Sequence, residues 1–180
     1  ERAAAVARAE EAYRAGEERV RAVGDNLPDG AVYQVSVPPG GPPRFAHISA
    51  GVETLLGVPA AEVVADPETL YRLVHPDDIG GFRAAELAAF TALRPFEYEF
   101  RSHTRGGAVR WLHVRSRPTP RADGGSDWNG LLLDVTERRR AEDALRRSES
   151  LFRGIFQNAS AGVSLTGPDG RFVAANPAFE

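Results

Sequence analysis

Hydrophobic and polar residues alternate strictly in two stretches in the second half of the chain, and this period of two predicts amphipathic β-strands. The stretches are FEYEFRS at residues 96–102 and AVRWLHVRSRPT at residues 108–119. A polar connection then leads to LLLDV at residues 131–135, which predicts a last strand. Nearer the start, residues 30–37 (GAVYQVSV) and 44–49 (RFAHIS) are separated by a loop of prolines and glycines and predict a β-hairpin.

Between these two groups of strands the hydrophobic pattern is helical and is interrupted by glycine and proline. We expect Ser49 to cap a first short helix, Gly57 to end it and Asp66 to cap a later one. Residues 75–93 predict a longer helix with four apolar positions roughly on one side: Ile79, Phe82, Leu87 and Phe90. Two strands, several short helices and three strands predict an α+β fold, in which a five-stranded antiparallel sheet has helices on one face.

An internal repeat organises the chain. Residues 9–26 and 141–158 share seven identities in 18 positions, at an offset of 132. Helices rich in Ala, Glu and Arg can resemble one another by chance. Here, however, the likeness continues into residues 158–167 and 171–176, which parallel the first two strands in order.

The repeat divides the chain into a linker helix (1–26), a complete domain (27–135), an exit helix (136–157) and the start of a second domain (158–180). We therefore expect the sequence to be a piece of a longer tandem array. So short a hairpin cannot bury its own core. Four of its apolar residues are thus expected to be frayed or packed on another surface: Val163, Leu165, Phe172 and Phe179.

Four motifs stand in the order and spacing of a known family. They are LLGVPAAEVV (55–64), LVHPDDIGGF (73–82), the strand pair at 96–118, and GLLLDVTERRRAEDALRRSE (130–149). The complete unit therefore resembles a PAS domain with its C-terminal PAC-type motif. The final RFVAANPAFE resembles the start of a second PAS domain, whose Asn176 matches a common family position and corresponds to Ser49 in the first unit.

The resemblance implies a sensory module of a multi-domain signal-transduction protein. Such modules bind a small ligand or a partner and pass the signal through linker helices to an output domain, here expected to be a histidine kinase of a two-component system or a diguanylate cyclase. A ligand-free dimerisation or spacer module is the alternative, and a haem- or flavin-binding redox sensor is a second alternative. No catalytic constellation is visible, so the sequence itself is not expected to be an enzyme.

Composition narrows the classes of function that the sequence allows. The net charge of −3 gives no reason to expect nucleic acid as a partner. No apolar run approaches the length of a membrane span, and we expect a cytoplasmic protein. The absence of cysteine excludes a cysteinyl–flavin adduct and Cys-ligated metal.

His75, in VHPDD, could in principle ligate haem or a metal, but we favour a role for its ring and Asp77 in shaping the turn into the following helix. The remaining histidines have no helical metal-site spacing. No metal site and no cofactor are therefore predicted. Haem and noncovalent flavin stay open but disfavoured.

Both linker helices carry a narrow apolar stripe at heptad spacing with a charged opposite face. A single amphipathic helix packed on its own domain needs the same stripe, but the narrowness favours a two-helix partner and thus a homodimer. The predicted dimer seam comprises Val6, Tyr13, Val20, Val23, Leu145, Phe152 and Ile155.

Asp134 and Thr136 lie where the last strand becomes the exit helix. Asp134 is expected to cap that helix, with Glu137 completing a box-like pair. The resemblance implies that Asp134 also pairs with a basic residue such as Arg138 and relays the signal from sheet to helix, and a plain cap is the alternative.

Trp111 is predicted to lie opposite Leu112 and Val114 on its strand, since side chains alternate across a sheet. It would then be available to a flanking helix or a partner subunit.

Overall fold

The computed structural model describes residues 24–179. Four of the predicted seam residues (Val6, Tyr13, Val20 and Val23) lie outside this range. The described chain divides into two compact units, the first ending at Thr136 and the second beginning at Glu137. No helix in residues 24–179 is long and apolar enough to cross a membrane.

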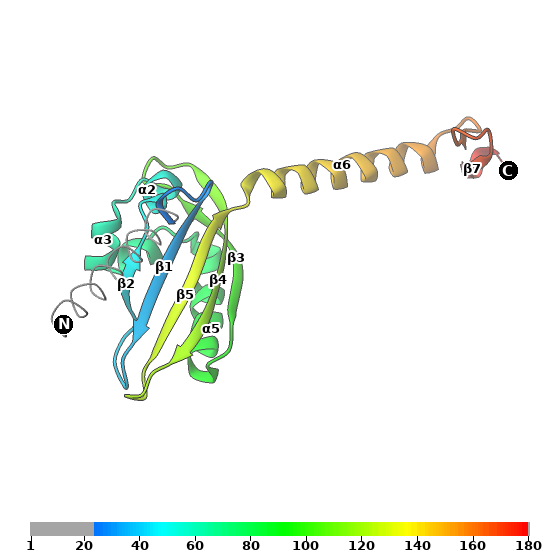
Figure 1. Ribbon diagram of the computed structural model, residues 1–180. Helices are drawn as coiled ribbons and strands as arrows, with labels where there is room; N and C mark the ends of the chain where they lie inside the picture. The colour runs from blue at the N-terminus through cyan, green and yellow to red at the C-terminus, as the bar shows by residue number, and fades with distance from the viewer. Residues whose placement is uncertain (1–23, 180) are drawn as a thin grey trace, which may run out of the picture. The chain divides into compact units, whose positions relative to one another are not determined.

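The first unit is built on the predicted five-stranded antiparallel sheet (Figure 1). Its spatial order is β2-β1-β5-β4-β3, so the first and last strands in sequence pair at the centre. The strands are β1 (Gly30–Val37), β2 (Arg44–Ile48), β3 (Phe96–His103), β4 (Val109–Pro120) and β5 (Ser126–Asp134).

The helices between β2 and β3 cover one face of this sheet (Figure 1). They are α2 (Gly51–Leu56), α3 (Ala60–Ala65), α4 (Glu68–Tyr71) and α5 (Pro76–Ala92). Gly57 ends α2 in the left-handed region, with φ of 73°, as predicted. Inward-facing side chains of the sheet and the helices form one core, in which Val52, Leu55, Leu112 and Trp128 are almost fully buried.

Three local predictions were wrong. β5 begins at Ser126 rather than at residue 131, because Ser126 and Trp128 face the core while Asp127 and Asn129 alternate with them on the outer face. Ser49 does not cap α2: it is buried, and its hydroxyl accepts a hydrogen bond from the Val32 N–H. Leu87 is 67% exposed, because the buried stripe of α5 passes through Phe82 and Ala89 instead.

The second unit contains α6 (Thr136–Asn158, which begins at the last residue of the first unit), the hairpin β6 (Ser164–Thr166) and β7 (Phe172–Ala175), and the 3₁₀ turn η1 (Pro177–Phe179). No residue of α6 is buried. The hairpin is formed, but Phe172, Val173 and Phe179 are mostly exposed within it.

Candidate functional site: an aromatic cavity and the start of the exit helix

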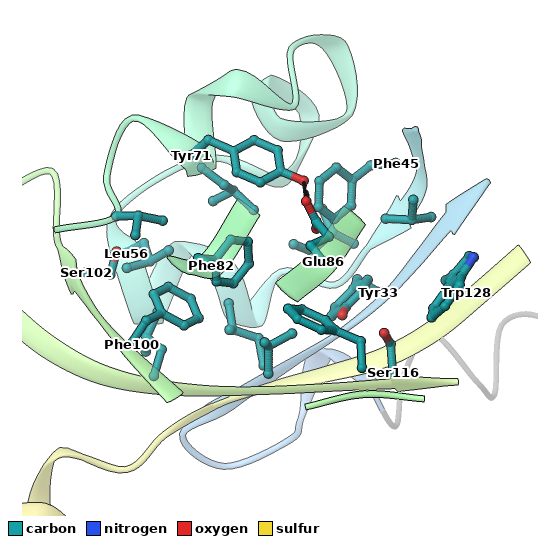
Figure 2. Close-up of a pocket in the computed structure, with 18 of the residues that line it drawn as sticks. Tyr33, Phe45, Leu56, Tyr71, Phe82, Glu86, Phe100, Ser102, Ser116 and Trp128 are labelled. Atoms are coloured by element: carbon teal, nitrogen blue, oxygen red, sulfur yellow. Dashed lines mark hydrogen bonds between the residues drawn. The ribbon is translucent and has the colours of Figure 1, made fainter. Parts of the chain in front are cut away.

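A cavity of about 60 Å³ lies between the inner face of the sheet and helices α4 and α5 (Figure 2). The sheet contributes five aromatic side chains to its wall: Tyr33, Phe45, Phe96, Phe100 and Trp128. The two helices contribute three more: Tyr71, Phe82 and Phe90. Most of the remaining wall is aliphatic, so the space favours an apolar guest.

One carboxyl group interrupts this apolar wall. Glu86 projects from α5 towards Tyr71, whose hydroxyl donates to the carboxylate and lies 2.9 Å from each of its oxygens (Figure 2). Burial raises the pKa of Glu86 above its ordinary value and outweighs the lowering effects of Tyr71 and of Arg83. Burial, together with the Glu86 charge, also raises the pKa of Tyr71.

Arg83 supports Tyr71 from outside the cavity. Its guanidinium lies 4.5 Å from the centroid of the Tyr71 ring and donates to Glu68 at 2.6 Å. Tyr71 is therefore held between a cation on one face of its ring and a carboxylate at its hydroxyl.

Tyr33, on β1 of the sheet, is a second polar residue of the cavity wall. Burial raises the pKa of Tyr33 to about 12, against a hydrogen bond from Ser116 that lowers it. The ring crosses Gly130 on the neighbouring strand, where a β-carbon would come within 2.4 Å of the Tyr33 ring carbon Cζ. Glycine at this position is what allows the ring to lie flat against the strand.

The size of the cavity limits its contents. At about 10–15 Å³ per water-sized group, 60 Å³ holds about four to six such groups. A haem or a flavin ring system is several times larger and does not fit without repacking the aromatic wall.

His75 does not line the cavity: its ring nitrogen accepts from the Asp77 N–H at 3.3 Å, and the ring stacks on His103. The predicted structural role of His75 at the start of α5 is confirmed. No cluster of three or more metal-ligating side chains occurs in residues 24–179.

The segment Asp134–Val135–Thr136, which we call the joint, is fastened to β4. The Asp134 carboxylate accepts from the Thr136 N–H and from the Arg110 guanidinium, both at 2.8 Å. The Thr136 hydroxyl accepts from the Trp111 N–H at 2.9 Å, and the Val135 N–H donates to the Trp111 carbonyl. All three residues of the joint are therefore hydrogen-bonded to β4.

The cap at the joint agrees with the sequence, but its partners differ from those expected. The basic partner of Asp134 is Arg110, whereas Arg138 donates to Glu142 one turn further on. Glu137 does not complete the capping box, since its carboxylate accepts from Arg140.

The pKa of Asp134 is displaced in the direction that favours its charged form. Burial acts to raise it, but the hydrogen bonds from Thr136 and Arg110 outweigh burial and hold it below its ordinary value. The carboxylate is therefore ionised at neutral pH and keeps both contacts.

Two predicted interaction surfaces lie where the sequence places them. Trp111 lies on the outer face of the sheet, opposite the buried Leu112, with Arg101 over its ring at 5.9 Å. The α6 members of the dimer seam, Leu145, Phe152 and Ile155, are all exposed. A partner for either surface stays a prediction.

Sequence reasoning missed the residues that define the cavity: Tyr33, Tyr71, Glu86 and Trp128. One signal was available. Phe82, Glu86 and Phe90 are spaced by four residues and therefore share one face of α5, so a carboxylate stands within an aromatic stripe. Tyr71 gave no comparable signal, because a single turn of helix has no readable period.

Comparison with known families agrees with this architecture. Residues 45–131 match the family model described as the PAS fold, and residues 150–180 match a second model described as PAS domain. With the five-stranded sheet and its one-sided helices, this defines the class of the first unit as a sensory domain. The chain contains a PAS domain.

Among solved structures, a sensory box histidine kinase/response regulator from Burkholderia thailandensis is 26% identical, with a TM-score of 0.53, covering 69% of this chain and 91% of that one. The N-terminal domain of a diguanylate cyclase with PAS/PAC sensor from Marinobacter aquaeolei is 17% identical, with a TM-score of 0.52, covering 61% and 98%. The second likeness shows the fold alone.

Among curated proteins, the uncharacterized protein y4lL of Sinorhizobium fredii is 33% identical over 101 residues. The match covers 55% of this chain and 12% of that protein, so the chain spans a small part of its relative.

Proposed function

We propose that the PAS domain senses a small molecule in the aromatic cavity and passes the change through β4 to the joint and α6. The observation that carries this proposal is the double role of β4. Leu112, Val114 and Ser116 line the cavity, while Arg110 and Trp111 of the same strand hold Asp134 and Thr136. A displacement of β4 by a ligand thus acts directly on the start of α6.

The exposed stripe of α6 supports a dimer as the receiver of this change. A seam of Leu145, Phe152 and Ile155 interrupted by polar residues is weak, and weak packing suits an element that must switch between two arrangements. The likeness to a sensory box histidine kinase/response regulator supports a histidine kinase as the output domain of the full-length protein, with a diguanylate cyclase as the other predicted type.

The relay is tested with Asp134→Ala in the full-length protein. We expect the activity of its output domain, assayed for both kinase and cyclase, to change at least several-fold while residues 1–180 carrying the same substitution keep their circular dichroism spectrum. Glu137→Ala, which removes a carboxylate outside the joint, is the matched control and leaves output unchanged. Unchanged output in Asp134→Ala would contradict the relay and leave Asp134 as a plain cap.

A ligand-free spacer is the second candidate, and one observation favours it. Within residues 24–179, every buried side-chain polar atom already has a hydrogen-bond partner, so the fold does not need a guest to satisfy it. Mass spectrometry of small molecules extracted from the purified protein separates the two functions, and its absorption spectrum tests haem and flavin.

A further inference from the structure

The cavity wall is asymmetric in charge. It contains one carboxyl group, that of Glu86, and among the described residues no arginine or histidine side chain lines it. The other polar side chains on the wall are the hydroxyls of Tyr33, Tyr71, Ser102 and Ser116 and the indole of Trp128, whose N–H donates to Ser126. An anionic guest would therefore find no counter-charge, whereas a cationic guest would find one.

The aromatic wall favours the same sign of charge. Each aromatic ring carries partial negative charge on its face, and a desolvated cation is attracted to it. Phe90 and Trp128 meet at 61° with ring centroids 4.6 Å apart, and Phe82 meets Phe100 at 63° and 4.7 Å. Such tilted pairs turn ring faces in several directions, as in sites that recognise substituted ammonium groups.

Arg83 is the cation that acts on Glu86, and it does so from outside the cavity. Arg83, on the same helix, is held by Glu68 and by the Tyr71 ring and does not line the cavity. On α4, Glu68 is a like charge, and Tyr71 donates a hydrogen bond; on β1, Tyr33 is neutral at pH 7.

We propose that the cavity selects a small organic cation, an alkylammonium of about four to six heavy atoms, with Glu86 as its counter-ion. This inference rests on the proposed ligand-sensing function and names the class of ligand. Because burial raises the pKa of Glu86, binding of a cation releases a proton wherever the free carboxyl is protonated. Affinity for the cation therefore rises with pH until Glu86 is ionised in the free protein.

The two tryptophans make the test internally controlled. Trp128 lines the cavity and Trp111 lies on the outer face. In ¹⁵N NMR spectra the indole N–H signal of Trp128 therefore responds to a ligand in the cavity, and that of Trp111 serves as the control. Trp111→Phe assigns the two signals. The probes are isobutylammonium, isobutanol and isobutyrate, which share a branched four-carbon skeleton and differ in charge.

We expect isobutylammonium to shift the Trp128 signal and to bind at least about tenfold more tightly than isobutanol, with no saturable effect of isobutyrate. Glu86→Gln keeps a hydrogen-bonding partner for Tyr71 but removes the charge, and should abolish the preference. Glu68→Gln removes a neighbouring carboxylate outside the cavity and should retain it. The pH dependence of isobutylammonium affinity in the wild-type protein decides the question if Glu86→Gln does not fold.

The outcomes separate this inference from the proposed function. Equal binding of isobutylammonium and isobutanol, or a preference that survives in a folded Glu86→Gln protein, overturns selection by charge and leaves a ligand-holding cavity. If no probe shifts Trp128, the small-ligand form of the proposed function fails together with the inference.

Discussion

The chain forms the same hydrogen-bonded corner twice, once in each unit. In the first, the Val32 N–H donates to the Ser49 hydroxyl at 3.1 Å, and the Ser49 N–H donates to the Val32 carbonyl at 2.9 Å. In the second, the Val163 N–H donates to the Asn176 side-chain oxygen at 2.7 Å, and the Asn176 N–H returns to the Val163 carbonyl at 2.9 Å. Ser49 and Asn176 are the residues that the repeat aligns, and both are buried.

Around this shared corner the two regions differ in what they bury. In the first unit, Ala31 of β1 and Ile48 of β2 are buried under helices. In the second, Phe172 and Val173 of β7 are 73% and 70% exposed. A pair of reciprocal hydrogen bonds can thus fix the geometry of a hairpin without a core. Its stability, however, comes from apolar burial, which the first unit has and the second hairpin lacks.

The largest test of this contrast compares Leu112→Ala with Phe172→Ala. Leu112 is fully buried, so its truncation should lower the free energy of unfolding by about 2–5 kcal/mol. Phe172→Ala should change it by less than about 0.5 kcal/mol. Urea unfolding followed by tryptophan fluorescence measures the first unit, in which Trp111 and Trp128 lie, and amide hydrogen exchange measures the hairpin of the second unit. Similar losses would mean that Phe172 is covered in solution.

The corner itself is tested by Ser49→Ala and Asn176→Ala. Removing the Ser49 hydroxyl leaves the Val32 N–H without its acceptor in a partly buried place, and should destabilise the first unit by about 1 kcal/mol. Asn176→Ala should leave that unit unchanged and accelerate amide hydrogen exchange at Val163. If Asn176→Ala also lowered the stability of the first unit, the two regions would not be independent.

Acid should weaken the first unit through Asp78. Hydrogen bonds from Arg101 hold the pKa of this carboxyl below its ordinary value. The pair therefore contributes fully above about pH 4, and its contribution is lost as pH falls through the lowered folded-state pKa. Asp78→Asn should cost about 1 kcal/mol at neutral pH, with the difference from wild type shrinking in acid.

The matched change for this titration is Asp169→Asn in the second hairpin. Its ion pair with Arg171 is exposed and 3.7 Å long, so no measurable loss is expected at any pH. An Asp78→Asn difference that persisted undiminished at low pH would assign the effect to packing rather than to charge.

The smallest expected effect on folding is that of Phe152→Ser on α6. The side chain is exposed, so the free energy of unfolding of the first unit should change by less than about 0.5 kcal/mol. Analytical ultracentrifugation should nevertheless show weaker dimerisation, as the predicted seam requires. Asp143→Ser, on the opposite, charged side of the helix, is the control, and equal association in both variants would reject the seam.

Sequence patterns predicted the helices and strands better than the contacts between them. The two hairpins and the equivalence of Ser49 and Asn176 could be read from order and spacing, because strands and turns are local. The start of β5 could not, since Asp127 and Asn129 dominate the pattern around the buried Trp128.

The cavity and the pairing at the joint depend on contacts between distant segments. Arg110 reaches Asp134 across 24 residues of sequence, and their pairing follows only once β4 and β5 are in register. The same holds for Glu86, which meets Tyr71 only after α4 and α5 have packed on the sheet.

Gly130 determines the size of the cavity although it does not belong to the cavity wall. The residue is not part of the lining, yet the Tyr33 ring occupies the space that a β-carbon at this position would need. A methyl group added there would push that ring towards the guest and shrink the chamber. Related chains could thus change the length of the molecule they accept by one substitution in β5, while every residue that touches the molecule stays the same.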